Sequence, residues 1–67
     1  MNERVRWRMQ AATWCDELAE TFEFVAKANE ELMHPIKAKR SFHKASELRY
    51  EAMAFKYEAV KELKLID

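Results

Sequence analysis

Three arginines, Arg4, Arg6 and Arg8, crowd the start of the chain in the stretch NERVRWRM, with Trp7 among them. The N-terminus of a helix carries partial positive charge, so cations are electrostatically unfavourable there. Cations beside free backbone N–H groups are, however, a suitable arrangement for holding a phosphate or a carboxylate. The arginines therefore either pair with acids elsewhere in the fold or bind an anionic ligand.

A second basic cluster follows the only proline, in the stretch PIKAKRSFHK. Lys37, Arg40 and Lys44 are three and four residues apart, so they share one face of a helix. If both basic helix starts held RNA or a nucleotide between protomers, cations would contact phosphates and aromatic rings would stack on bases. The residues of this anion-binding hypothesis are Arg4, Trp7, Arg8, Lys37, Arg40, His43, Lys44 and Tyr50.

The acidic and histidine residues form no complete metal-binding pattern. Glu31 and His34 have the spacing of a carboxylate and histidine ligand pair in helical di-iron sites, but such a site needs a further inward-facing carboxylate. His34 directly precedes Pro35, and we expect it to cap the end of a helix instead. No metal or other cofactor is expected. A run of acids on consecutive turns is typical of a solvated helix face: Asp16, Glu17, Glu20 and Glu23.

The residues give no support for an enzyme. The single cysteine, Cys15, lies next to Asp16 and has no neighbouring cation in the chain, so nothing lowers the pKa of its thiol. The chain contains no glycine, and it shows no Gly-rich phosphate loop or zinc-ligand spacing. We therefore predict a non-enzymatic protein without catalytic residues.

The composition predicts an all-α fold in a single domain, residues 1–67. Hydrophobic residues make up 49% of the chain and charged residues 36%, and good helix formers dominate. Pro35 suits the first position of a helix and breaks the pattern once. We expect helices over about residues 3–33 and 35–65, joined as an antiparallel hairpin. A kinked or swapped arrangement at Pro35 remains the alternative.

Apolar residues recur at helical spacing in two stripes per helix. We expect one stripe of each to pack within the hairpin: Trp7, Ala11, Trp14, Leu18, Phe22, Val25 and Leu32 with Ala45, Leu48, Ala52, Phe55, Ala59, Leu63 and Ile66. The second stripes would then remain exposed: Ala12, Cys15, Ala19, Ala26 and Met33, and Phe42, Tyr50, Met53, Tyr57 and Val60.

Exposed apolar stripes predict self-association, and a chain of 67 residues has only marginal stability alone. We expect a homo-oligomer, most simply a dimer that forms a four-helix bundle or else a higher helical oligomer. The residues expected at its interface are Cys15, Ala19, Phe42, Met53, Tyr57 and Val60.

The charges support antiparallel pairing. Residues 1–34 carry four basic and seven acidic side chains, whereas residues 35–67 carry eight basic and five acidic. In a hairpin the arginines of the first turns lie beside acids at the end of the second helix: Arg4, Arg6 and Arg8 beside Glu58, Glu62 and Asp67. The reverse holds at the connection: Glu30 and Glu31 beside Lys37, Lys39 and Arg40.

We therefore predict a small interaction module, a regulator, inhibitor or adaptor that binds a protein partner, in the manner of some small viral proteins. In length and hairpin plan the chain resembles the Rop family of plasmid copy-number regulators, which dimerise as four-helix bundles and bind RNA hairpins. No shared motif supports this resemblance. A lone cysteine and the lack of a long apolar run favour a cytoplasmic location without membrane binding. The expected partner-binding residues are Arg6, Phe24, Lys37, Lys39, Arg40 and Lys44.

Overall fold

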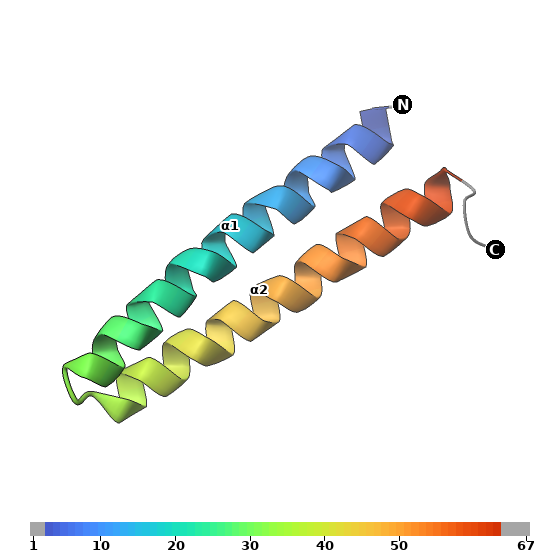
Figure 1. Ribbon diagram of the computed structural model, residues 1–67. Coiled ribbons are helices and arrows are strands. Elements are labelled where there is room, and N and C mark those ends of the chain that lie inside the picture. The colour runs from blue at the N-terminus through green and yellow to red at the C-terminus, as the bar shows by residue number, and fades with distance from the viewer. Residues whose placement is uncertain (1–2, 64–67) are drawn as a thin grey trace.

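The chain folds as an antiparallel hairpin of two long helices (Figure 1). The computed structural model describes residues 3–63, with α1 over Glu3–Glu31 and α2 over Pro35–Glu62. The molecule measures 47 × 19 × 11 Å, so it is a flat rod. The predicted all-α hairpin is confirmed, although α1 ends before residue 33. No helix within residues 3–63 is both long enough and apolar enough to cross a membrane.

The connection is short because α1 closes with a Schellman motif and α2 begins directly after it. The His34 N–H donates to the Asn29 carbonyl (2.8 Å), and the Met33 N–H donates to the Glu30 carbonyl (3.0 Å). Met33 has a φ of 62°, in the left-handed region that glycine usually occupies at this position. Pro35 then supplies the first residue of α2, as the sequence predicts.

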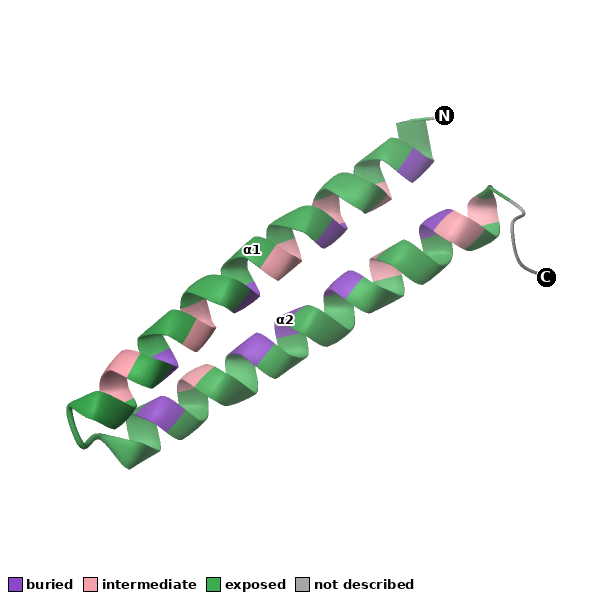
Figure 2. Cartoon of the chain, in the orientation of Figure 1, coloured by how far each residue is buried: buried purple, intermediate pink, exposed green. Residues whose placement is uncertain are grey.

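Small residues at every seventh position form the seam between the helices. Each is buried, and together they face the partner helix (Figure 2): Val5, Ala12, Ala19 and Ala26 in α1, and Ala38, Ala45, Ala52 and Ala59 in α2. Alanine at a helix contact allows two backbones to approach closely. Leu48 is the only larger buried residue of α2 within the described chain, and Phe22 and Cys15 pack against it and its alanine neighbours.

Four residues of the expected α2 stripe are buried and Phe55 is half-buried, but Leu63 is 41% exposed. Of the expected α1 stripe, Phe22 packs against the core and Trp7 contacts Phe55 edge to face with ring centroids 5.7 Å apart, but most of its large residues are exposed. Trp7, Trp14 and Leu18 are 60%, 59% and 50% exposed. The alanine stripe of α1 faces α2 instead, because small residues on both helices fit together more closely than a row of indole rings against alanines. Cys15 and Ala19, expected between chains, therefore pack within the hairpin.

Enlarging a seam alanine should separate the helices. We expect Ala19→Leu to lower the free energy of unfolding by about 1–3 kcal/mol, because the added methylenes have no space at a fully buried position. Ala54→Leu is the matched control, since Ala54 is exposed. Urea denaturation followed by circular dichroism measures both variants. Equal stability of Ala19→Leu and Ala54→Leu would contradict the alanine seam.

Candidate interaction surfaces

Two of the three N-terminal arginines bind an acid at the end of α2. Arg4 Nη1 lies 3.3 Å from Glu62 Oε1, and Arg8 Nη1 contacts the other oxygen of the same carboxylate. Desolvation raises the pKa of Glu62, but the hydrogen bonds from Arg8 and Arg4 outweigh it and hold this pKa below its ordinary value. The predicted pairing of Arg4 and Arg8 with Glu62 is confirmed, and these ion pairs account for two of the three arginines at the start of α1.

The other expected pairs are not formed among the described residues. Arg6 is exposed, and within residues 3–63 neither Arg6 nor Glu58 makes an ion pair. Asp67 lies outside the described residues. At the connection, the described residues form none of the ion pairs predicted between Glu30 or Glu31 and the basic residues Lys37, Lys39 and Arg40. These three cations are exposed at the start of α2 and have no acidic partner within residues 3–63.

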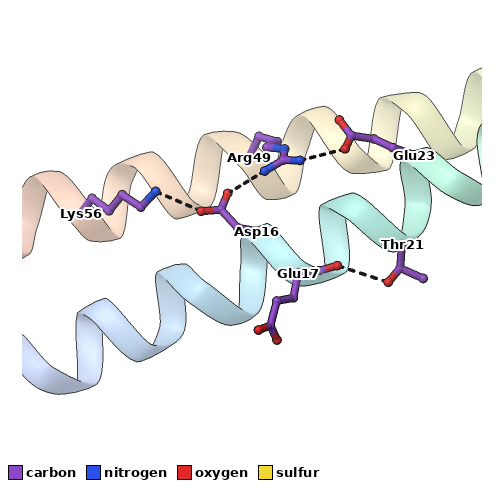
Figure 3. Close-up of polar contacts among 6 residues, drawn as sticks. All are labelled: Asp16, Glu17, Thr21, Glu23, Arg49 and Lys56. Carbon is purple, nitrogen blue, oxygen red and sulfur yellow. Dashed lines mark hydrogen bonds and ion pairs between the residues drawn. The ribbon is translucent and has the colours of Figure 1, made fainter.

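A cluster of four charges joins the helices at mid-length (Figure 3). Arg49 lies between Asp16 and Glu23, with N–O distances of 3.3 and 2.8 Å, and Lys56 Nζ lies 3.0 Å from the other oxygen of Asp16. The hydrogen bond from Lys56 is the main reason that the pKa of Asp16 lies below its ordinary value. Glu17, the residue after Asp16, points away from α2 in Figure 3.

The two remaining apolar stripes lie on opposite faces of the hairpin. We define the α1 stripe as Trp7, Ala11, Trp14, Leu18, Thr21, Val25, Ala28 and Leu32, and the α2 stripe as Phe42, Met53, Tyr57 and Val60. Leu18 is two residues, about 200° of helix rotation, from Asp16, so the α1 stripe lies opposite the charged cluster. Met53 is four residues from Arg49, so the α2 stripe lies on the same face as the cluster.

The α1 stripe is the more continuous of the two. Successive members are alternately four and three residues apart from Trp7 to Leu32, which is the spacing of a coiled-coil seam. Their exposure is high for large apolar side chains, reaching 66% at Leu32, and a hollow lies over Trp14, Glu17, Leu18 and Thr21. In the α2 stripe Phe42, Met53 and Tyr57 are 36%, 66% and 54% exposed, and Val60 is half-buried.

The structure separates several residues that were predicted to act together. Phe24 and Arg6 are both exposed on the outer face of α1, but they lie about 27 Å apart along the helix axis. Arg4 and Arg8 lie at the open end of the hairpin, whereas Lys37 and its basic neighbours lie at the connection, at the other end of a 47 Å rod. A single chain therefore does not assemble the predicted anion site.

The cysteine and the acids show no reactive arrangement within the described residues. Burial raises the pKa of the Cys15 thiol, and the carboxylates of Glu51 and Asp16 raise it further. This environment disfavours the thiolate that a nucleophile needs. Among residues 3–63 no group of three or more His, Cys, Asp or Glu residues is placed to hold a metal ion.

No known protein family model matches the chain, and no curated protein or solved structure matches it either. Its function must therefore be inferred from its own residues. The sequence predictions did not recognise the α1 stripe as an exposed surface. The signal for it was present, because alanines seven residues apart occur in both helices and mark the seam.

We expect the Arg8–Glu62 pair to tolerate an exchange of charges. Arg8→Glu places two carboxylates together at a half-buried contact and should lower the urea midpoint of unfolding. The double variant Arg8→Glu with Glu62→Arg restores opposite charges and should recover most of the loss, as measured by circular dichroism. A double variant no more stable than Arg8→Glu alone would show that this contact does not stabilise the hairpin.

The charged cluster predicts a pH dependence on the acid side. Because the pKa of Asp16 is lowered in the fold, its ion pairs stabilise the protein above the ordinary aspartate pKa of about 3.9, and this contribution is lost as the pH falls through the folded value. Carboxyl NMR titration should report a pKa below that of free aspartate, and Lys56→Met should raise it. An Asp16 pKa unchanged in Lys56→Met would contradict the cluster.

Proposed function

We propose that this protein is a non-enzymatic helical interaction module that works as a homo-oligomer and docks a protein partner. The observation that carries the proposal is the α1 stripe, a heptad-spaced apolar surface that the hairpin leaves uncovered. Large contiguous apolar patches on a soluble surface mark sites of protein association. A stripe at coiled-coil spacing favours another helix as the contacting element.

The exposed area supports self-association. The chain exposes 5566 Å², whereas a globular monomer of 8.0 kDa is expected to expose about 4,500 Å². The surplus of roughly 1,000 Å² is similar to the ~800 Å² that each partner buries in a stable protein interface. The alanine seam explains the surplus, because alanines bury little apolar area and leave the tryptophans outside.

The assembled module retains outer surfaces for a different partner. Phe24 is 75% exposed on the outer face of α1 and has charged neighbours, a suitable setting for an interface anchor. At the start of α2 a hollow has apolar Ile36 and basic Arg40 and Lys44 in its lining. An adaptor, regulator or inhibitor would dock a protein on such a surface, and the basic residues favour an acidic target.

The alternative is an anion-binding module that holds RNA or a nucleotide between protomers. Lys37, Lys39 and Arg40 favour it, because they are exposed beside a helix N-terminus and make no ion pairs with other described residues. Arg4 and Arg8 weaken it, since both bind Glu62. A single-stranded RNA oligonucleotide tests it. If these cations contact RNA phosphates, the affinity for the oligonucleotide should fall steeply as the salt concentration rises. Absence of RNA binding at low salt would reject the alternative.

Self-association should depend on the α1 stripe. Native mass spectrometry of the purified protein should give a multiple of 8.0 kDa, and Leu18→Glu should shift the population towards monomer because it puts a charge in the stripe. Thr13→Glu is the control, since it adds the same charge at an exposed position of α1 outside the stripe. Circular dichroism confirms that both variants remain helical. A monomeric wild-type protein at high concentration would overturn the oligomer.

A further inference from the structure

We propose that the α1 stripe of one copy packs against the α2 stripe of a second copy, so that the chains associate head to tail. This inference rests on the proposed self-association and specifies its surfaces. It differs from a two-fold dimer, in which the same patch of both copies meets itself.

The opposite placement of the stripes is the first reason. The α2 stripe lies on the face that carries Asp16, Arg49 and Lys56, and the α1 stripe lies on the other face. Two hairpins that met through one shared face would cover one stripe of each copy and leave the other stripe exposed. Contact of α1 with the α2 of a neighbour, repeated from copy to copy, covers both stripes of every copy once the series of contacts closes into a ring.

Charge complementarity is the second reason. Carboxylates border the α1 stripe. Glu17 lines the same hollow as Trp14 and Leu18. Glu3 precedes Glu17 by fourteen residues and Glu31 follows it by fourteen, so all three lie on the same edge of α1. Glu51 of α2 follows Arg49 by two residues, so it lies on the face of the α1 stripe. None of these four carboxylates makes an ion pair within the described chain. Arg4 and Arg8 line a hollow with Trp7 at the start of this stripe, but both bind Glu62.

Cations border the α2 stripe. Lys39 lines a hollow with Phe42, and Lys61 lies one residue after Val60 and four after Tyr57. Two carboxylates lie among them, because Glu30 lines the hollow at Phe42 and Glu58 the hollow at Tyr57. Arg49 and Lys56 border the other side of the stripe, where their positive charge already offsets Asp16 and Glu23. Contact between unlike stripes therefore brings the unpaired carboxylates beside the α1 stripe to the cations beside the α2 stripe.

Both stripes also offer hollows for an inserted side chain. The hollow on the α1 stripe has Trp14 and Leu18 in its lining, and the hollow beside the α2 stripe has Met53 and Tyr57 in its lining. Large apolar side chains seated in such hollows are the usual anchors of a protein interface. A second copy of the chain thus supplies the shape, the apolar residues and the charge that each stripe lacks.

A mixing experiment distinguishes head-to-tail from two-fold association. Leu18→Glu blocks the α1 stripe and leaves the α2 stripe intact, whereas Met53→Glu does the reverse. Both positions are at least half exposed, so the hairpin should survive, and circular dichroism checks this. In head-to-tail association each variant alone is monomeric. Their mixture forms a one-to-one heterodimer of twice 8.0 kDa, which native mass spectrometry identifies when one variant carries ¹⁵N.

Other outcomes would overturn the proposal. If Met53→Glu alone still associates while Leu18→Glu does not, the interface joins two α1 stripes, and self-association stands without the head-to-tail arrangement. A mixture that remains monomeric would equally reject contact between unlike stripes. A monomeric wild-type protein would reject both proposals together. Trp14→Glu and Tyr57→Glu repeat the experiment at independent positions and should give the same heterodimer.

Discussion

The close packing of alanine on alanine between α1 and α2 is the constraint on which the rest of the molecule depends. With a small residue at every seventh position of both helices, the two backbones approach closely over the whole hairpin. This choice of seam fixes the rotation of each helix about its own axis. Once Ala12 and Ala19 face α2, Trp14 and Leu18 must face outward.

The ion pairs, and not the alanine seam, set the relative direction and register of α1 and α2. Arg8 and Glu62 meet at the open end, and Asp16, Arg49 and Lys56 meet at mid-length, which requires an antiparallel arrangement. Partly exposed pairs of this kind each contribute little to the free energy of folding, but unlike the alanines they are specific in position. The unfavourable charge at the start of α1 is thereby offset across the seam rather than within the helix.

Much of this fold could be predicted from the sequence. The lack of glycine and the single Pro35 gave two helices, and the unequal charge of the two halves gave their antiparallel pairing and the contacts of Arg4 and Arg8 with Glu62. The stripe of α1 was predicted wrongly because large apolar residues were given priority over small ones. The ion pairs expected at the connection are not formed among the described residues, because nearness of the two helix ends alone does not fix which side chains meet. The interaction surfaces could not be predicted until the seam was known.

The central claim is that the tryptophans of a single folded chain are more than half exposed, although Trp7 also contacts Phe55, and become fully covered only on association. Acrylamide quenching of tryptophan fluorescence, measured over a range of protein concentrations, tests it most directly. We predict ready quenching of Trp7 and Trp14 in the dilute, folded monomer and progressive protection as the protein is concentrated. Tryptophans already protected in a monomer, as verified by its mass, would show that they pack inside the hairpin and would contradict the alanine seam.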